Sequence, residues 1–273
     1  MNRFRDLRGI STFSPEDADA FKDDPLFLRS VARTVAVMMA FQNARHPLSL
    51  SQVAAEAGID RSAAQRIIHS LMKLDMLSRD PEDRGYLPGM RVLDMTHDLL
   101  RLNPMLQRAN PVLLQLRRRV RERVDLSLFD DVRVIYALRM PSKHETFNAT
   151  IVGNTVPTYC TAGGIAVLAR LPDEKIADIV GRSDLTPFTQ HTVRDLDGVM
   201  QYVNATRKRG HSILLRQLLN HEIAMGAAIT DAKGIPVGAI HVAGNLQEWT
   251  EEEFSNNFGL LLQTAAKTIS EHA

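Results

Sequence analysis

Residues 49–73, SLSQVAAEAGIDRSAAQRIIHSLMK, predict two short helices joined by a tight turn. Ser49 is followed three residues later by Gln52, which is the spacing of a capping box at the start of a helix. Gly58 ends this first helix, because glycine adopts the left-handed conformation after a helix at little cost. Asp60 can cap a second helix, and two short helices joined by a glycine turn indicate a helix-turn-helix.

The second helix, expected over residues 61–74, has an apolar face and a polar face. Successive side chains lie about 100° apart around a helix axis, so the sequence assigns each residue to a face. The apolar face contains Ala64, Ile67, Ile68, Leu71 and Leu74. The polar face contains Ser62, Gln65, Arg66, His69 and Lys73. Taken alone, this pattern fits a helix that reads DNA and a packed helix with a solvated face equally well.

Residues 78–87 predict a strand, a turn and a second strand, and they favour DNA binding. The turn contains Pro81 and Gly85, and Arg79 and Arg84 flank its tip. A helix-turn-helix followed by a short basic hairpin is a winged helix, whose second helix enters the major groove. The residues expected to contact base edges and nearby phosphates are Arg61, Ser62, Gln65, Arg66 and His69. Those expected to contact phosphates, which position a protein without specifying a sequence, are Lys73, Arg79 and Arg84.

The composition is typical of a globular protein with one large domain or two ordinary ones. The chain has 273 residues, of which 44% are hydrophobic and 24% are charged. No apolar run approaches the ~18 residues that span a bilayer, and the N-terminus lacks the apolar region of a secretory signal. The single cysteine, Cys160, excludes an intramolecular disulfide framework and a cysteine-cluster zinc site. We therefore expect a cytoplasmic protein with no membrane partner, no metal and no cofactor.

The net charge of +1 conceals an uneven distribution. Residues 1–25 carry four basic and six acidic side chains, whereas residues 89–124 carry eight arginines and three acidic side chains. A local basic zone can steer a protein toward phosphate even when the total charge is near zero. A solvated helix face explains the arginine run of residues 117–123 at least as well.

The chain divides into four expected segments. They are a polar N-terminal arm (1–25), a winged helix-turn-helix domain (26–88), linker helices (89–124) and a C-terminal domain (125–273). We expect a short helix after Ser14 in the arm, and a helix from Pro25 to about Phe41 at the start of the winged helix. Asn103-Pro104 and Asn110-Pro111 are expected to interrupt the linker helices. The linker has spare apolar surface, so we expect it to contribute to dimerisation, which fits a two-fold DNA site.

The C-terminal domain is expected to be an α+β domain. Short strands are predicted at residues 126–129, 133–138, 156–160, 211–215, 223–229 and 237–243. Helices are predicted to start at Thr161, Asp173, Leu196 and Glu251, the last of them after a capping box at Thr250. This order predicts an antiparallel sheet that helices cover on one side, with a ligand cavity between the two layers.

Motifs of the common enzyme classes are absent from the sequence. There is no Gly-x-Ser-x-Gly elbow, no phosphate loop with a following lysine and no His-Glu-x-x-His, and the nine histidines lack metal-ligand spacing. We therefore expect a protein that is not an enzyme. The alternative to a DNA-binding regulator is a small-molecule sensor whose N-terminal module binds protein. Binding to a palindromic duplex with a steep salt dependence distinguishes the two.

Over residues 26–272 the chain resembles the IclR (isocitrate lyase regulator) family of bacterial transcription regulators. The segments that carry the resemblance are residues 49–58, Ser62 and Arg66, YLPG at 86–89, VPTYCTAGG at 156–164, and residues 222–231 with 238–244. The resemblance implies a winged helix, a linker helix and a GAF-like effector-binding domain. It also implies homodimers or homotetramers on palindromic promoter sites.

The resemblance further implies an effector pocket in the C-terminal domain. By position, its residues are Thr161, Ala162, Gly163, Gly164, Leu214, Glu222, Ala224, His241 and Ala243. Backbone amides at the start of the helix that follows Thr161 favour a carboxylate, so we expect a small organic acid, of the aromatic class, as effector. Strand alternation supports the choice, because Glu222 shares a face with Ala224 and His241 shares a face with Ala243.

Departures from the family pattern predict a pocket that is more apolar than usual. Leu214 stands where the family often has an acidic residue, and His241 stands where small hydroxyl residues are frequent. His221 and Ala228 replace a glycine and a proline of the family. His241 is then the distinctive polar group of the pocket. Cys160 is interpreted as a packed residue, because no neighbouring cation lowers the pKa of its thiol.

Overall fold

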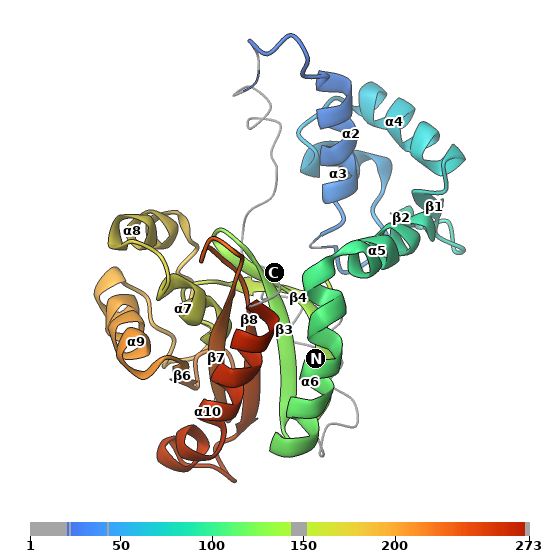
Figure 1. Cartoon of the computed structure of the whole chain (residues 1–273). Helices are drawn as coiled ribbons and strands as arrows, with labels where there is room; N and C mark the ends of the chain where they lie inside the picture. The colour runs from blue at the N-terminus through green and yellow to red at the C-terminus, as the bar shows by residue number, and fades with distance from the viewer. Residues whose placement is uncertain (1–20, 22, 43, 143–151, 271–273) are drawn as a thin grey trace. The chain divides into compact units, whose positions relative to one another are not determined.

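The computed structural model describes residues 21, 23–42, 44–142 and 152–270. These residues form two compact units, which divide between Leu99 and Leu100. Figure 1 shows their elements. The short helix predicted after Ser14 lies outside the described residues. Within the described ranges, no helix combines the length and the apolar character needed to cross a bilayer.

The N-terminal unit is the winged helix-turn-helix that the sequence predicts. Its elements are α2 (Arg29–Met39), α3 (Leu50–Glu56), α4 (Arg61–Lys73), β1 (Leu77–Arg79) and β2 (Tyr86–Pro88). The capping box forms, since the Ser49 amide donates to Gln52 Oε1 at 2.9 Å and Ser49 Oγ accepts from the Gln52 amide. Gly58 has a φ of 62°, and Asp60 Oδ1 accepts from the Ala63 amide at 2.8 Å. The local capping signals therefore determine where these helices start and end.

The linker contains two helices whose ends differ from the prediction. They are α5 (Arg91–Leu102) and α6 (Pro104–Val120). Asn103 and Pro104 interrupt the linker helices as expected, with Asn103 as the cap of α6, but Pro111 lies inside α6 and does not interrupt it. Leu106, before the proline, and Leu113, after it, both pack in the same core, and this burial offsets the roughly 3 kcal/mol that an interior proline costs.

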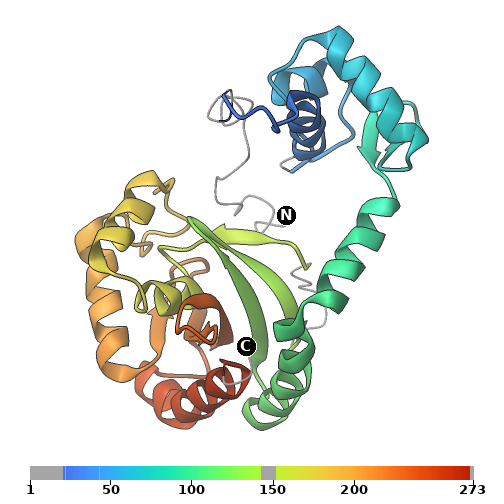
Figure 2. The ribbon, with the colours of Figure 1, turned by 45° about the horizontal axis from the view of Figure 1, so that its top comes forward.

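The C-terminal unit is built on one antiparallel six-stranded sheet with the order β5-β4-β3-β8-β7-β6. Figure 2 shows the curled sheet. Its strands are β3 (Arg123–Asp130), β4 (Arg133–Met140), β5 (Thr155–Pro157), β6 (Ser212–Leu215), β7 (Glu222–Thr230) and β8 (Pro236–Asn245). In the central pairing, Asp125 is opposite His241. Two strands that are far apart in the sequence therefore form the middle of the sheet.

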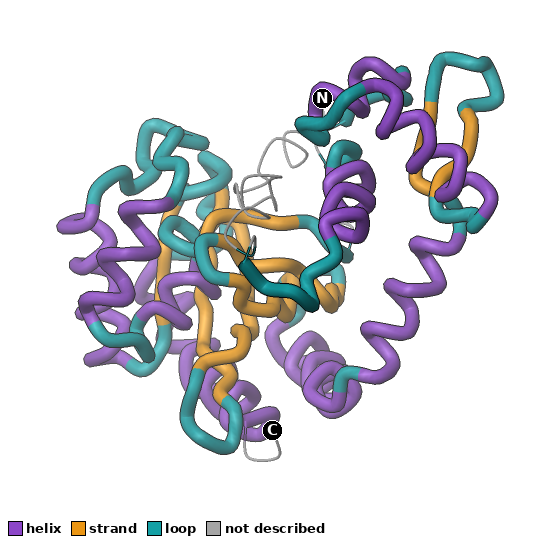
Figure 3. The backbone as a smooth tube through the Cα atoms, turned by 90° about the horizontal axis from the view of Figure 1, so that it is seen from above, coloured by secondary structure: helices purple, strands orange, loops and turns teal. Residues whose placement is uncertain are grey.

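Helices cover both faces of this sheet, so the prediction of a single covered face was wrong. The helices after the third strand are α7 (Ala162–Leu168), α8 (Asp173–Arg182), α9 (Leu196–Arg209) and α10 (Glu251–Ser270). α6 and α10 pack on the face that carries Val124 and Ile240, and α7 packs on the opposite face of β7 and β8. Figure 3 shows helices on either side of the strands. The polar side chains of Asp125 and His241 point to the α7 side because strand residues alternate between faces.

Candidate functional site

The polar face of α4 is open to solvent. All six predicted DNA-binding residues of α4 are exposed: Arg61, Ser62, Gln65, Arg66, His69 and Lys73. Ala64, Ile68 and Leu71 are buried, as the helical pattern predicts. Leu74, which was assigned to the apolar face, is 60% exposed because it follows the last helical residue and leaves the helical path.

The side chains of this face have no partners in the described part of the chain. Arg66, His69 and Lys73 make no hydrogen bond or ion pair there, in contrast to Arg123 and Arg182 of the other unit. The alternative role for Arg66, as a surface ion-pair partner, therefore finds no support among the described residues. A row of unpaired donors on an exposed helix is well placed for the edges of bases and for phosphates.

The wing arginines are already paired with acidic side chains. Arg79 forms a close ion pair with Asp83, and Arg84 Nε lies 2.8 Å from Asp80 Oδ2. Glu82 also lies within 3.2 Å of the Arg84 guanidinium. The guanidinium of Arg79 or Arg84 must leave a carboxylate before it can bind a phosphate. Phosphate contact by these two residues stays a prediction, and α4 presents the stronger basic surface.

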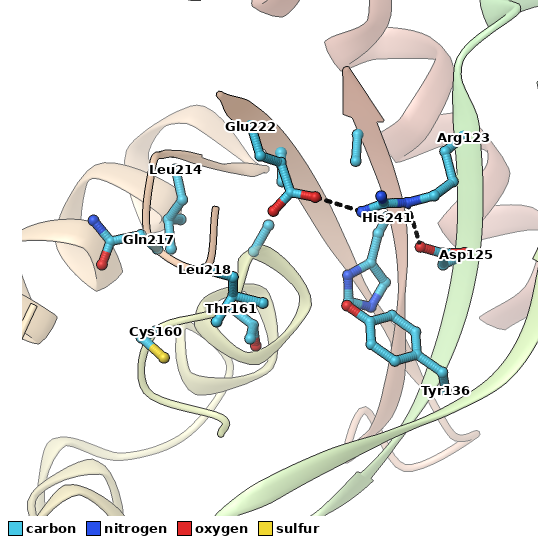
Figure 4. Close-up of a pocket in the computed structure, with 13 residues that line it drawn as sticks. Arg123, Asp125, Tyr136, Cys160, Thr161, Leu214, Gln217, Leu218, Glu222 and His241 are labelled. Carbon is cyan, nitrogen blue, oxygen red and sulfur yellow. Dashed lines mark hydrogen bonds and ion pairs between the residues drawn. The ribbon is translucent and has the colours of Figure 1, made fainter. Parts of the chain in front are cut away.

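The C-terminal unit contains a pocket between β3, β7 and β8 and the start of α7. Figure 4 shows its side chains. The lining residues are Arg123, Asp125, Tyr136, Cys160, Thr161, Ala162, Leu214, Gln217, Leu218, Glu222, Ala224, His241 and Ala243. The structure therefore brings together seven of the nine residues expected at this site. Strand register explains this, since Ala243 lies opposite both Arg123 and Ala224.

Gly163 and Gly164 are absent from the lining and serve a different purpose. A Cβ atom on Gly163 would overlap the imidazole of His241, and one on Gly164 would overlap the carbonyl oxygen of Thr158. Both glycines let α7 approach the sheet closely. α7 has only seven residues, and Thr161 Oγ1 already accepts from the Gly164 amide at 3.1 Å. The start of this helix is therefore a weaker carboxylate site than expected.

The pocket contains several charged side chains, so the prediction of His241 as its distinctive polar group was wrong. Arg123 donates to Glu222 at 2.5 Å and to Asp125 at 3.1 Å, as the dashed lines of Figure 4 mark. Arg139 donates to both oxygens of Asp125, at 2.7 and 2.9 Å. Burial raises the pKa of Asp125, but the two guanidinium groups outweigh it and hold that pKa below its usual range.

Sequence reasoning missed Arg123 and Asp125, although a signal for them exists. In RVDLSLFD, residues 123–130, polar side chains at 123, 125 and 127 alternate with apolar ones at 124, 126 and 128. Such alternation places the polar set on one face of the strand. Because Val124 and Leu126 face the core under α6 and α10, Arg123 and Asp125 must face the pocket.

Tyr136 and His241 provide the uncharged polar groups of the pocket. Burial lowers the pKa of His241 to about 4, so its imidazole is neutral near pH 7, and its Nε2 lies 2.6 Å from Ser127 Oγ. Burial raises the pKa of Tyr136, which keeps the phenol protonated. Tyr136 as a residue is 7% exposed and lines the pocket, and its hydroxyl has no hydrogen-bond partner among the described residues. Cys160 is buried, and burial raises the pKa of its thiol, as expected for a packed residue.

Comparison with known families identifies the chain. Residues 97–271 match the model described as "Bacterial transcriptional regulator IclR C-terminal", and residues 30–81 match the IclR helix-turn-helix domain. The chain belongs to the IclR family. It is a DNA-binding transcriptional regulator with a C-terminal effector domain, as the sequence predicts, and not an enzyme.

Curated relatives of this IclR-family regulator cover most of its length. The Pca regulon regulatory protein of Pseudomonas putida is 27% identical over 251 residues, which is 92% of this chain and 86% of the relative. The transcriptional repressor IclR of Escherichia coli (strain K12) is 21% identical over 245 residues, 89% of each chain. Their names give no support to the alternative of a protein-binding N-terminal module.

Solved structures share its fold. An IclR-family regulator from Brucella abortus has a TM-score of 0.80 at 17% identity and covers 97% of this chain and 100% of its own. An IclR homolog from Microbacterium hydrocarbonoxydans, solved in complex with 4-hydroxybenzoate, has a TM-score of 0.72 at 21% identity. That comparison covers 89% of this chain and 98% of the other.

Proposed function

We propose that this IclR-family regulator binds a palindromic operator as a homodimer or homotetramer, and that a small organic acid controls this binding from the C-terminal pocket. The regulator then acts in the cytoplasm, where its operator is. The observation that carries the effector half of the proposal is the Tyr136 hydroxyl, a donor on a residue that lines the pocket, with no partner among the described residues.

For the operator, α4 is the element that enters the major groove. Gln65 and Arg66 lie in the second turn of α4, are exposed, and have the geometry to donate to adenine and guanine edges. Lys73 at the end of α4 suits a phosphate of the flanking backbone. The polar face of α4 and the expected two-fold site together support DNA recognition by two copies of this unit.

For assembly, α5 supports an interface with a second copy. None of its residues is buried, and Leu93, Met95, Leu99 and Leu102 are each between 57% and 65% exposed. Apolar side chains gathered along an exposed helix mark an interaction surface. A second copy of the chain is the occupant that a palindromic operator requires.

For the effector, the pocket combines a cation, a neutral donor and apolar walls. Arg123 suits a carboxylate, and the Tyr136 hydroxyl can donate to a second ligand oxygen. Leu214, Leu218 and Ala224 offer apolar surface to a ring. The 4-hydroxybenzoate bound to the Microbacterium hydrocarbonoxydans homolog supports an aromatic acid as the class of ligand.

An operator titration with Tyr136→Phe tests the proposal. We expect 4-hydroxybenzoate to shift the fluorescence anisotropy of a labelled duplex from upstream of this regulator's own gene in the presence of wild-type protein. Loss of a hydrogen bond to a charged ligand weakens binding by about 1.5–3 kcal/mol, so the midpoint of the shift should move to roughly tenfold to a hundredfold higher acid concentration.

Tyr159→Phe is the matched control, because it removes the hydroxyl of a buried tyrosine outside the pocket lining, which also has no partner among the described residues. Its midpoint should equal that of the wild type. The proposed effector class is refuted if neither aromatic nor aliphatic carboxylates change operator binding. An unchanged midpoint for Tyr136→Phe removes this pocket as the site.

A further inference from the structure

Among the described residues, the charges in and beside the pocket balance without any ligand. Arg123 and Arg139 face the carboxylates of Asp125 and Glu222 across the strand ends, and His241 adds no charge near pH 7. An added carboxylate would leave this buried cluster with an excess negative charge. An uncompensated buried charge costs several kcal/mol. Binding of an acid therefore requires the carboxylate of either Asp125 or Glu222 to move out of the cluster.

The pocket also lacks room for an organic acid in this structure. Its free volume is about 20 Å³, which accommodates about one water molecule. The Arg123–Glu222 ion pair crosses the pocket, as Figure 4 shows. Separation of this pair would open the space and expose the guanidinium at the same time.

Of the two carboxylates, Glu222 is the one that can leave. Asp125 is 1% exposed and accepts three hydrogen bonds from Arg123 and Arg139. The side chain of Glu222 is 10% exposed and accepts one hydrogen bond from Arg123. Glu222 is also the first residue of β7, directly after the loop that carries Gln217 and Leu218 at the edge of the pocket. It therefore has solvent within reach, whereas Asp125 has none.

We propose that the Glu222 carboxylate is a built-in competitor, which occupies Arg123 in the free regulator and is displaced when the carboxylate of the effector binds there. This inference rests on the proposed function, since it concerns the same pocket and the same class of ligand. The ion pair raises the effector concentration that is needed for binding, because each effector molecule must break the pair before it can bind. Displacement of Glu222 also releases one attachment of the loop that carries Gln217 and Leu218.

Calorimetric titration of Glu222→Gln with 4-hydroxybenzoate near pH 7 tests the inference. Glutamine keeps the shape of the side chain but is a weak competitor for a guanidinium, so the affinity for 4-hydroxybenzoate should rise by about tenfold or more. The affinity for the neutral analogue 4-hydroxybenzamide should rise far less, because this compound carries no carboxylate to compete with Glu222 for Arg123. Glu174→Gln, at an exposed position of α8, removes the same charge elsewhere and should leave both affinities unchanged.

A second variant links the effect to Arg123. Arg123→Gln should weaken binding of 4-hydroxybenzoate, and the Glu222→Gln change should give no further gain in that background, since the competition no longer exists. Glu222→Asp retains the charge on a shorter side chain, so its affinity should lie between those of the wild type and Glu222→Gln. This variant keeps the test decisive if Glu222→Gln folds poorly.

The outcomes separate this inference from the proposed function. If Glu222→Gln and Glu222→Asp bind 4-hydroxybenzoate no more tightly than the wild type while Tyr136→Phe weakens binding, the competitor role is refuted and the effector site stands. If none of the proteins binds any carboxylate probe, both proposals are refuted together.

Discussion

Replacement of Asp125 by asparagine is expected to lower the free energy of unfolding of the C-terminal unit by about 3–5 kcal/mol. Asp125 is 1% exposed and is the common partner of Arg123 and Arg139, whose side chains are themselves 12% and 10% exposed. Asparagine offers one acceptor oxygen in place of two, and its amide group points a donor at a guanidinium. The substitution therefore removes the negative charge that Arg123 and Arg139 share.

Urea unfolding followed by tryptophan fluorescence measures this loss. Trp249 is the single tryptophan of the chain and packs against Phe254 and Phe258, so its signal reports on the C-terminal unit. Asp173→Asn is the control, because it removes an acid that is 62% exposed from its pair with Arg207. That change should cost less than about 1 kcal/mol. Equal losses for the two variants would contradict the role given to Asp125.

A second large effect is expected from Gly164→Ala in α7. A Cβ atom at residue 164 would overlap the backbone carbonyl of Thr158, and neither the helix nor the sheet can move without disturbing the core. Overpacking of this kind costs about 1–3 kcal/mol or more. The substitution should therefore destabilise the C-terminal unit, although alanine is the better helix former.

Gly181→Ala in α8 makes the same chemical change where the added methyl group meets nothing within 4 Å. It should stabilise the unit by roughly 0.5–1 kcal/mol, because alanine has less backbone freedom to lose. Urea unfolding followed by Trp249 fluorescence distinguishes the two variants by the sign of the change in the free energy of unfolding. A Gly164→Ala protein as stable as the wild type would show that α7 does not approach the sheet as closely as described.

The parts of the fold that depend on local contacts were predictable from the sequence. The capping box of Ser49, the left-handed Gly58 and the Asp60 cap each involve residues within three positions of one another, and all three form as predicted. The wing ion pairs are equally local: Arg79 precedes Asp83 by four residues, as Asp80 precedes Arg84. They could have been predicted from that spacing.

The parts that depend on distant contacts were not predictable. Arg123 and Glu222 are 99 residues apart, and only the strand order β3-β8-β7 brings them to one pocket. The continuity of α6 across Pro111 likewise depends on a core that includes β3 and α10. In both places tertiary packing outweighs the local pattern. Family resemblance placed Glu222 and His241 in the pocket, but it did not indicate the two arginines that determine its charge.

Operator binding by Arg66→Ala tests the central claim, that the exposed polar face of α4 reads DNA. Fluorescence anisotropy should show wild-type binding to the upstream duplex that weakens steeply with salt. Arg66→Ala should weaken that binding by about 1–3 kcal/mol, while Arg194→Ala, an exposed arginine of the C-terminal unit, should leave it unchanged. Wild-type affinity in Arg66→Ala would contradict the claim.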